Sequence, residues 1–458
     1  MNLEQAVLSQ SEAMIRSLQE SLRIPSVQGP AVEGAPYGVE VRRCLDHALD
    51  TACRLGFSVT DMDHQMGWCE YGEGEEMVAV LGHLDVVPEG DDWSFEPYGG
   101  EVRDGMILGR GTTDDKGPTI AALYALAAIK ELGLPIRRRI RLFFGTNEET
   151  GSNDMKYYVS HGGEMPVMGF TPDGEYPVIN GEKGIINVTF AKKYTQENSN
   201  IKLVRIQGGL APNVVPAHAE AEFACEAKLA EELVSKSIDK IHFSMTDTGF
   251  KVCAEGVGAH GSTPELGENA IGRLLQGLDT LPLDGELAEA IHFIAEKLGM
   301  ETDGSSAGIY LEDDISGKLT LNLGVISGDE SGLSIKINYR YPVTKCYDDC
   351  GHKFKSIFEE AGFILEGETH KASLYIPEDS ELIQTLLRVY TEKTGDINGR
   401  PKSIGGGTYA KALPNTVAFG PIFPGDEVRE HEPDEYIEVD KLIKNAQIIA
   451  AAMYELAK

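Results

Sequence analysis

Three short strand-like runs in the first half of the chain are each followed, within two residues, by a polar or acidic side chain, and this pattern restricts the folds that the chain can adopt. The runs, at residues 77–81, 139–144 and 168–171, have the length of buried β-strands. Between the first two lies a mostly apolar helical stretch at residues 119–132, preceded by Pro118 at a favourable first-turn position. Strands that alternate with helices predict an α/β fold, with a mixed, mostly parallel sheet covered by helices on both faces.

The middle of the chain carries a different pattern. Residues 217–225 alternate apolar and polar side chains, as a strand with one buried face does. Residues 319–327 and 333–341 are predicted to form a hairpin whose loop has about five residues. Because helical stretches separate these strands, we predict an α+β region.

The first pattern returns near the C-terminus, with a helix predicted at residues 380–394 and a long last helix predicted from Glu435. We therefore expect one discontinuous α/β domain, residues 1–185 and 376–458, interrupted by an inserted α+β domain at residues 186–375. The insert is long enough for two similar halves.

The composition limits the partners of the chain. Its 41 basic and 73 acidic residues give a net charge of -32, which argues against binding to nucleic acids or anionic membranes and suits a protein that attracts cations. No apolar run approaches the roughly 18–20 residues of a membrane span, and the first residues do not have the pattern of a signal peptide. The seven cysteines are scattered and form no CxxC motif, as free thiols in a reducing cytoplasm would. We expect a cytoplasmic protein that binds neither nucleic acid nor membrane.

Two polar segments have more than one interpretation when each is taken alone. LGHLDVVP follows the first strand and places His83 and Asp85 on the same side of an extended chain, where Asp85 can orient the imidazole. A lone HxD pattern is nevertheless a weak signal. GRGTTDDKGP presents Asp114 and Asp115 before a helix, where the helix dipole alone favours acidic residues.

Two further segments make a functional site the better interpretation. GTNEETG, which ends the second strand, carries Glu148 and Glu149, and FTPDGEYP, which ends the third, carries Asp173. Because the carboxyl ends of parallel strands meet at one crevice, we expect all these side chains to lie together. So many carboxylates in one place either take up protons or bind cations.

Imidazole and carboxylate groups suit zinc, manganese or cobalt, and the lack of cysteine ligands argues against a purely structural zinc site. Several carboxylates with more than one histidine suit two metals about 3.5–4 Å apart, bridged by one carboxylate and a water. The second histidine is expected near the return of the α/β domain, where GDEVREHEPDEY offers His431 in a loop.

The segments HLDVVPEGDDW, GRGTTDDKGP, GTNEETG and FTPDGEYP, in this order and spacing, resemble the co-catalytic zinc peptidases. That family includes dipeptidase V, carnosinase, aminoacylase and succinyl-diaminopimelate desuccinylase. The likeness covers nearly the whole chain. The sequence VINGEKG and the long insert resemble the bacterial dipeptidase-V type.

The resemblance implies a catalytic domain interrupted by a lid domain, and a ligand set for two divalent metals, with zinc as the expected metal. His83 and Asp173 would hold one metal, Glu149 and His431 the other, and Asp114 would bridge them.

The resemblance also implies roles for residues that do not bind metal. Asp85 would support His83, and Glu148 would act first as general base and then as general acid. The peptide bond between Asp114 and Asp115 is expected to be cis. His260, in GVGAHGSTP of the insert, would polarise the scissile carbonyl or stabilise the oxyanion.

Further positions resemble family residues that bind substrate. The guanidinium of an arginine suits a carboxylate because it makes bidentate contacts, and the free N–H groups of a helix start suit the C-terminal carboxylate of a peptide. These positions are Asn213, Arg340, Gly406, Gly407 and Thr408.

The function implied by the resemblance is hydrolysis of the amide bond of a small peptide with a free N-terminus, by a hydroxide held between two metals. A long lid that supplies His260 within the same chain favours a monomer. An N-acyl amino-acid deacylase or desuccinylase with the same metals is an alternative. A catalytically silent relative that binds metal or peptide is another, although every ligand position and the base are present.

Overall fold

The computed structural model describes residues 1–195, 199–236 and 238–458. The chain divides into two compact units. The first unit consists of Met1–Asn180, Ile376–Lys402 and Gly407–Lys458, and the second of Gly181–Tyr375 and Ser403–Gly406.

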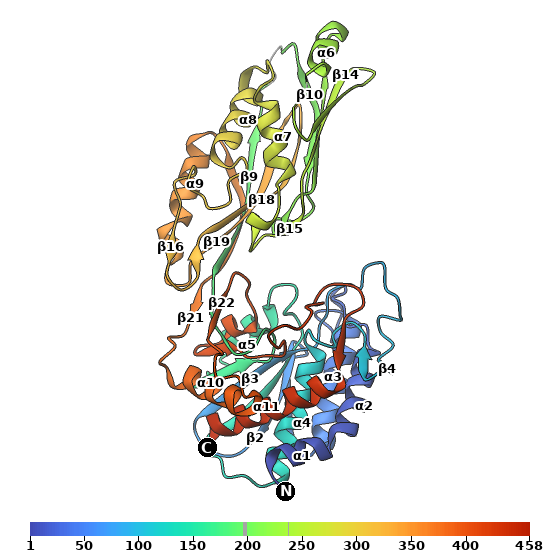
Figure 1. The fold of residues 1–458 in the computed structure, drawn as a ribbon, viewed down its shortest axis with the longest axis vertical. Coiled ribbons are helices and arrows are strands. Elements are labelled where there is room, and N and C mark those ends of the chain that lie inside the picture. Colours follow the sequence, from blue (N-terminus) through green and yellow to red (C-terminus); the bar gives the residue numbers. More distant parts are fainter. Residues whose placement is uncertain (196–198, 237) are drawn as a thin grey trace. The chain divides into compact units, whose positions relative to one another are not determined.

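A nine-stranded mixed sheet organises the first unit (Figure 1). Its strands lie in the order β1 (Ser58–Met62), β2 (Met66–Tyr71), β6 (Arg139–Gly145), β3 (Met77–His83), β7 (Met168–Thr171), β23 (Thr416–Ala418), β8 (Ile179–Glu182) and β21 (Leu374–Tyr375), and β22 (Lys402–Ile404) pairs with β8. The pairs β6–β3, β3–β7 and β7–β23 are parallel, whereas the outer pairs are antiparallel. The predicted mixed α/β sheet is confirmed, and its parallel strands form the centre.

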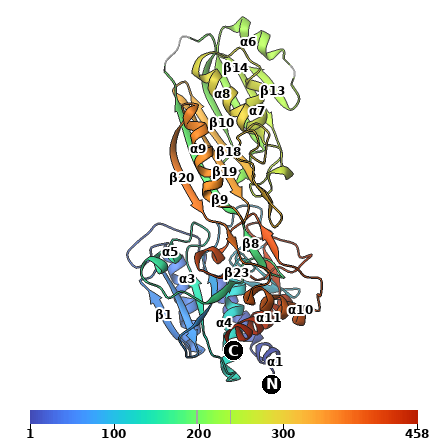
Figure 2. The ribbon, with the colours of Figure 1, turned by 90° about the vertical axis from the view of Figure 1, so that its left-hand side faces the viewer.

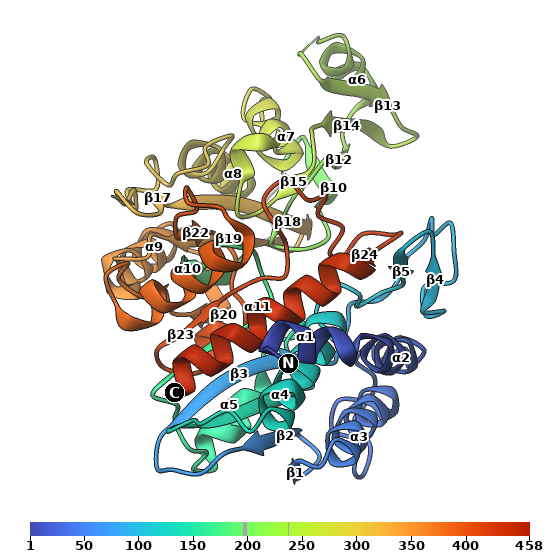
Figure 3. The same cartoon turned by 60° about the horizontal axis from the view of Figure 1, so that its bottom comes forward.

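Side chains of β3 point alternately to two hydrophobic cores, one on each face of this sheet. Val78 and Val80 join the larger core, and Ala79 and Leu81 join the smaller one. The larger core is built with α1 (Leu3–Ser9), α2 (Ser11–Leu22), α3 (Val39–Arg54), α4 (Lys116–Glu131), α10 (Glu381–Thr394) and α11 (Val439–Ala457). Figure 3 shows α1 and α4 beside α11. The smaller core contains residues of α5 (Asn153–Ser160) and of the short 3₁₀ helix η3 (Tyr409–Ala412), so helices cover both faces, as predicted.

The second unit is built on an eight-stranded antiparallel sheet. Its strands lie in the order β13 (Ile241–Met245), β14 (Gly249–Glu255), β12 (His218–Ala224), β10 (Lys202–Gly208), β18 (Thr320–Asp329), β19 (Gly332–Tyr341), β9 (Gly184–Lys193) and β20 (Ile364–Lys371). Figure 2 shows α7 (Ala270–Leu278), α8 (Gly285–Lys297) and α9 (Gly351–Glu360) along this sheet, and all three contribute to one core with it. In β12, Ala219, Ala221 and Phe223 enter that core, which is what the alternating sequence predicted.

Two predicted boundaries were wrong. The hairpin of β18 and β19 has a two-residue loop instead of about five residues, because Asp329 pairs with Gly332 and the Asp329 carboxylate accepts hydrogen bonds from Ser331. The last helix begins at Val439 instead of Glu435, because residues 436–438 form a strand, β24 (Tyr436–Glu438), that pairs with β5 (Met106–Leu108).

None of the helices in the described part of the chain combines the length and the apolar composition that a membrane span requires.

Candidate active site

His83 is the last residue of β3, and its ring is held by Asp85 and Tyr409. Its Nδ1 lies 3.0 Å from the backbone oxygen of Asp85 and 3.5 Å from the Asp85 carboxylate. The ring of Tyr409 contacts it edge-on, with 5.8 Å between the ring centres. With Nδ1 bonded to a carbonyl, Nε2 is the nitrogen that can ligate a metal.

Asp114 lies in the loop between β5 and α4, and its two carboxylate oxygens face different histidines. Oδ1 lies 3.0 Å from His83 Nε2, and Oδ2 lies 2.9 Å from His431 Nε2. The peptide bond between Asp114 and Asp115 is cis, as the resemblance implied. A carboxylate between two imidazoles has the geometry expected of a bridging ligand.

Two groups of potential metal ligands meet at Asp114. In each group the ligand atoms lie within 4.8 Å of one another, and the groups are His83 with Asp114 and Asp173, and Asp114 with Glu149 and His431. Glu149 Oε1 and His83 Nε2 are buried polar atoms that make no well-directed hydrogen bond among the described residues, although His83 Nε2 lies 3.0 Å from Asp114 Oδ1. Because buried polar atoms normally have partners, these two fit the role of metal ligands. The five residues predicted as ligands are thus brought together by the fold.

The charges of the cluster also favour cations. Burial, followed by the nearby charge of Asp114, raises the pKa of Asp173 well above its usual value and raises the pKa of Glu149. Hydrogen bonds to Asp114 and Glu149 raise the pKa of His431 to about 11. Asp173 and Glu149 thus resist ionisation beside Asp114, and a divalent cation at this place would relieve the repulsion between the carboxylates.

The turn that carries Glu148 and Glu149 is held by two buried carboxylates. Asp85 accepts the N–H groups of Glu148 and Glu149 through its two oxygens, each at 3.1 Å. Asp154 Oδ2 accepts the two preceding N–H groups, those of Thr146 at 2.7 Å and Asn147 at 3.2 Å. The four consecutive backbone N–H groups of residues 146–149 thus donate to the carboxylates of Asp85 and Asp154, which fixes the conformation of the turn.

The two glutamates of this turn have different surroundings. Glu149 belongs to a ligand group, whereas Glu148 belongs to none of the ligand groups among the described residues. The carboxylate of Glu148 is near enough to Asp173 to contribute to the raised pKa of that residue. Glu148 therefore lies close to the potential metal ligands but belongs to neither of the two ligand groups that share Asp114.

Two predicted substrate residues, Asn213 and Arg340, and His260 lie in one chain of contacts within the second unit. Asn213 accepts the N–H of Gly261 through its backbone oxygen at 2.7 Å, and His260 Nδ1 lies 2.6 Å from Ser262 Oγ. Ser262 packs on Gly405, where a Cβ atom would come within 2.7 Å of the Ser262 side chain. Gly405, the neighbour of Gly406, accepts a hydrogen bond from Arg340 Nη1 at 2.7 Å.

Arg340 is a buried cation without an acidic partner among the described residues. Its side chain donates to Asn338 Oδ1 at 3.0 Å and to the backbone oxygen of Gly405. It is 3% exposed, and burial lowers its pKa to about 10. Because buried charges are normally paired, this guanidinium is suited to an anion from a ligand.

The glycine-rich segment differs in one respect from the prediction. Thr408 caps the N-terminus of η3, a 3₁₀ helix of only four residues, and its hydroxyl accepts the N–H of Ala410 at 3.1 Å. Gly407 precedes it in the first unit. The helix start therefore offers fewer N–H groups to a carboxylate than the sequence suggested.

A third group of potential metal ligands lies on the second unit's sheet, formed by His218, Glu220 and Cys253. Glu220 is already paired with Lys251 at 2.6 Å and Arg205 at 2.8 Å. Two cations on its carboxylate make this group a poor place for a metal.

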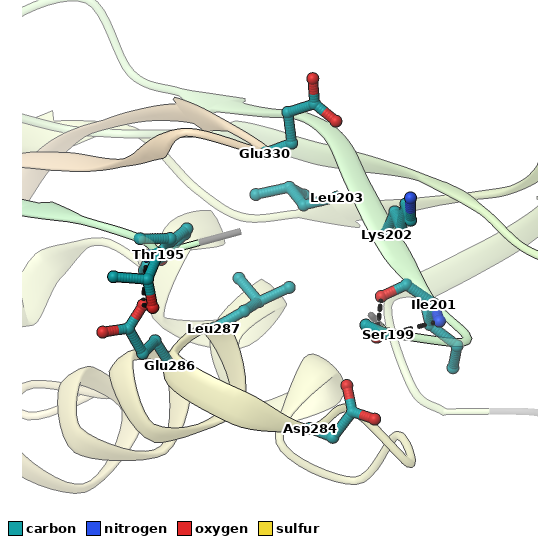
Figure 4. A pocket seen from close by; sticks show the side chains of 10 residues that line it. Thr195, Ser199, Ile201, Lys202, Leu203, Asp284, Glu286, Leu287 and Glu330 are labelled. Carbon is teal, nitrogen blue, oxygen red and sulfur yellow. Dashed lines mark hydrogen bonds between the residues drawn. The ribbon is translucent and has the colours of Figure 1, made fainter. Parts of the chain in front are cut away.

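A pocket of about 300 Å³ in the second unit contains none of the predicted site residues (Figure 4). Asp284, Glu286 and Glu330 line it together with Lys202. Glu286 is engaged with Thr195, whose N–H and hydroxyl both donate to it. The pocket is lined by neither imidazole nor thiol among the described residues.

Sequence reasoning missed three residues that hold the site, namely Asp154, Tyr409 and Glu435. Asp154 is fully buried and accepts hydrogen bonds from Met155 N–H at 2.7 Å and from the Tyr409 hydroxyl. Gly145 leaves room for that tyrosine, since a Cβ atom there would come within 2.3 Å of its ring. The only signal for Asp154 was an acid in the first turn of a predicted helical segment, which has a simpler explanation in the helix dipole.

Asp154→Asn tests the support of the turn. Burial raises the pKa of Asp154 to about 6 from its ordinary value of 3.8. A raised carboxyl pKa contributes stability at low pH that is lost as the pH rises through the folded-state value. The stability advantage of wild type over Asp154→Asn should therefore shrink by roughly 1–3 kcal/mol between about pH 4 and about pH 7. Urea unfolding of both metal-free proteins measures it.

Asp313→Asn is the control for that prediction. Although burial opposes it, hydrogen bonds from Ser316 and Thr344 lower the pKa of Asp313. Its contribution is complete above its unfolded-state pKa, so its stability difference should not shrink over the same pH range. A deficit of Asp154→Asn that stays constant or grows with pH contradicts the role of Asp154.

Comparisons with known proteins agree with this geometry. Residues 79–455 match the family described as Peptidase family M20/M25/M40. Two curated relatives are both named "Putative dipeptidase": YtjP of Bacillus subtilis is 38% identical, with 100% of each chain covered, and a Staphylococcus epidermidis protein is 35% identical, with 99% of each covered.

Solved structures share the fold at low sequence identity. Human carnosine dipeptidase 1 has a TM-score of 0.57 at 16% identity, covering 99% of this chain and 98% of that chain. An M20 family metallo-carboxypeptidase from Sulfolobus solfataricus has a TM-score of 0.60 at 14% identity, covering 97% and 99%. With the family match over most of the chain, these findings establish that the chain belongs to peptidase family M20/M25/M40 and is a metallopeptidase.

Proposed function

We propose that this protein is a metal-dependent dipeptidase that hydrolyses the amide bond of small peptides with a free N-terminus. The observation that carries the proposal is the pair of ligand groups that share Asp114, with Glu148 beside them and outside both. The names of the curated relatives, which are dipeptidase names, favour this substrate class over other amides.

The residues at Asp114 would hold two divalent metals, with zinc as the expected ion and manganese or cobalt as alternatives. His83 and Asp173 would ligate one metal, Glu149 and His431 the other, and Asp114 both. When bound, such metals lower the pKa of a coordinated water and polarise the carbonyl oxygen.

The protein's own groups would then move the proton. Glu148 would take a proton from the attacking water and deliver it to the nitrogen of the leaving amine. Asp85 fixes the backbone N–H of Glu148, so the carboxylate that moves the proton is presented by a rigid turn. Water attack on the amide carbon and protonation of the amine nitrogen break the C–N bond and give two amino acids.

Residues of the second unit would bind the substrate. Arg340 would pair with the C-terminal carboxylate, and His260 would donate a hydrogen bond to the developing oxyanion. Asn213 and the segment at Gly406, Gly407 and Thr408 would complete the contacts to the peptide. We propose that the first unit is the catalytic domain, that the second is a lid of two similar halves, and that the protein is monomeric.

The test is a panel of dipeptides, each offered with a free and with an acetylated N-terminus, to protein reconstituted with zinc, manganese or cobalt. Dipeptides with a free N-terminus should be cleaved at least tenfold faster than their acetylated forms. A tenfold ratio of rates corresponds to about 1.4 kcal/mol of transition-state stabilisation. Preference for acetylated substrates would instead identify an N-acyl amino-acid deacylase.

Metal content is to be measured on the same samples. About two metals per chain are expected, because two ligand groups share Asp114. One metal per chain would contradict the shared site, and metal binding without cleavage of any substrate would identify a silent relative.

A further inference from the structure

Glu435 is a fully buried carboxylate whose contacts converge on the loop that carries Asp114. Its Oε1 accepts the N–H of Thr113 at 2.8 Å, the hydroxyl of Thr113 at 2.9 Å and the N–H of Asp114 at 3.3 Å. Its Oε2 accepts the N–H of Gly111 at 3.0 Å. Three backbone donors within four consecutive residues are therefore satisfied by a single side chain.

The charge of Glu435 is balanced by Arg110, at the start of the same loop. Arg110 Nη1 donates to Glu435 Oε2 at 2.8 Å, and the two side chains are 1% and 0% exposed. Trp93 covers the guanidinium, with 5.1 Å from the ring centre to the guanidinium carbon. A buried ion pair with this many additional hydrogen bonds fixes geometry strongly, because removing one partner leaves the other charge buried.

Glu435 also ties this loop to the segment that carries His431. The two residues are four apart in sequence, and the backbone oxygen of Glu435 accepts the N–H of Gly109 at 3.0 Å. Directly after Glu435, β24 pairs with β5, the strand that enters the loop. His431 has a left-handed backbone conformation, with φ of 64°, which is uncommon for residues other than glycine.

We propose that Glu435 is a positioning residue that sets the distance between Asp114 and His431, and thereby the geometry of the ligand group that also contains Glu149. This rests on the proposed function, in which that group binds a divalent metal. Glu435 belongs to neither of the two ligand groups that meet at Asp114. It acts by holding two segments from distant parts of the chain, the loop that carries Asp114 and the segment that carries His431, at a fixed distance from each other.

The test is Glu435→Gln, compared with Glu70→Gln. Both variants remove a carboxylate that pairs with a buried arginine. Glu70 lies 2.6 Å from Arg141 on the sheet, and Arg141 keeps a second carboxylate, that of Glu164, at 3.0 Å. Metal affinity is measured by competition of cobalt and zinc with a chromophoric chelator, and backbone amide exchange of residues 109–115 is measured in the metal-free proteins.

Glu435→Gln is expected to weaken metal binding about 10–100-fold and to lower kcat with little change in KM, because outer-sphere partners of ligands typically have effects of this size. Amide exchange at residues 111–114 should become faster. Glu70→Gln should lower the unfolding temperature while leaving metal affinity and exchange in this loop unchanged. Equal metal affinity in Glu435→Gln and Glu70→Gln overturns the proposal.

Thr113→Val is the second variant, for the case that Glu435→Gln does not fold. It removes only the hydroxyl that donates to Glu435 Oε1, and a smaller loss of metal affinity is expected. Unchanged affinity and exchange in Thr113→Val would overturn the role of Glu435. If wild-type protein binds no metal, the proposed function fails, whereas the exchange of the metal-free variants still decides whether Glu435 holds the loop.

Discussion

Replacing Glu148 by glutamine should lower kcat by a factor of about 10²–10⁴ while both metals stay bound, because general acid–base catalysis by one side chain contributes this much. Glutamine keeps the size of the side chain and the backbone N–H that Asp85 accepts, so the turn is preserved. The amide can neither accept the proton of the attacking water nor return it to the amine. Steady-state kinetics on a cleaved dipeptide, with metal content measured on the same sample, checks this result.

Glu149→Gln is the matched variant, because it makes the same chemical change at the neighbouring residue. Glu149 Oε2 lies 3.2 Å from His431 Nε2, within a ligand group. This variant should lose metal as well as activity, since an amide oxygen is a weaker ligand for zinc than a carboxylate. If Glu148→Gln loses metal and Glu149→Gln keeps it, the two roles are reversed. If Glu148→Gln retains both metal and activity, the mechanism is wrong.

Local patterns were sufficient to predict where the ligand candidates lie. His83, Glu148 and Asp173 each follow an apolar run, and the parallel pairing of β6, β3 and β7 brings those strand ends to one edge of the sheet. That consequence depends on strand direction alone, so it can be derived without knowing any side-chain contact. His431 was placed by the need for a second imidazole rather than by a strand end.

The residues that hold these ligands could not be predicted in the same way. Glu435 bonds to the N–H of Asp114 across 321 residues of sequence, and no local pattern encodes such a partner. The same contact explains why the last helix was predicted to begin too early. Acidic residues before an apolar helical stretch are typical of a helix start, but here the carboxylate is taken by another loop and β24 precedes the helix.

Replacing Arg340 by methionine should lower kcat/KM for dipeptides with a free C-terminal carboxylate by a factor of about 10²–10³, because losing one partner of a buried charge pair costs 2–5 kcal/mol. For the corresponding dipeptide amides, kcat/KM should change less than about threefold, since an amide offers no negative charge to the guanidinium. Methionine keeps much of the buried volume of the arginine stem. Kinetics on acid and amide forms of one dipeptide, for wild type and variant, gives the result as a ratio.

Arg205→Met is the control, because Arg205 lies on the same sheet but is about half exposed and pairs with Glu220. Arg205→Met should leave kcat/KM unchanged for both the acid and the amide form of the dipeptide. Equal losses on the acid and the amide in Arg340→Met would mean that Arg340 stabilises the second unit without contacting a carboxylate. The burial of Arg340 favours a selective loss on the substrate with a free carboxylate. Among the described residues its donors meet only an amide oxygen and a backbone carbonyl oxygen. Its charge is therefore unbalanced until an anion binds.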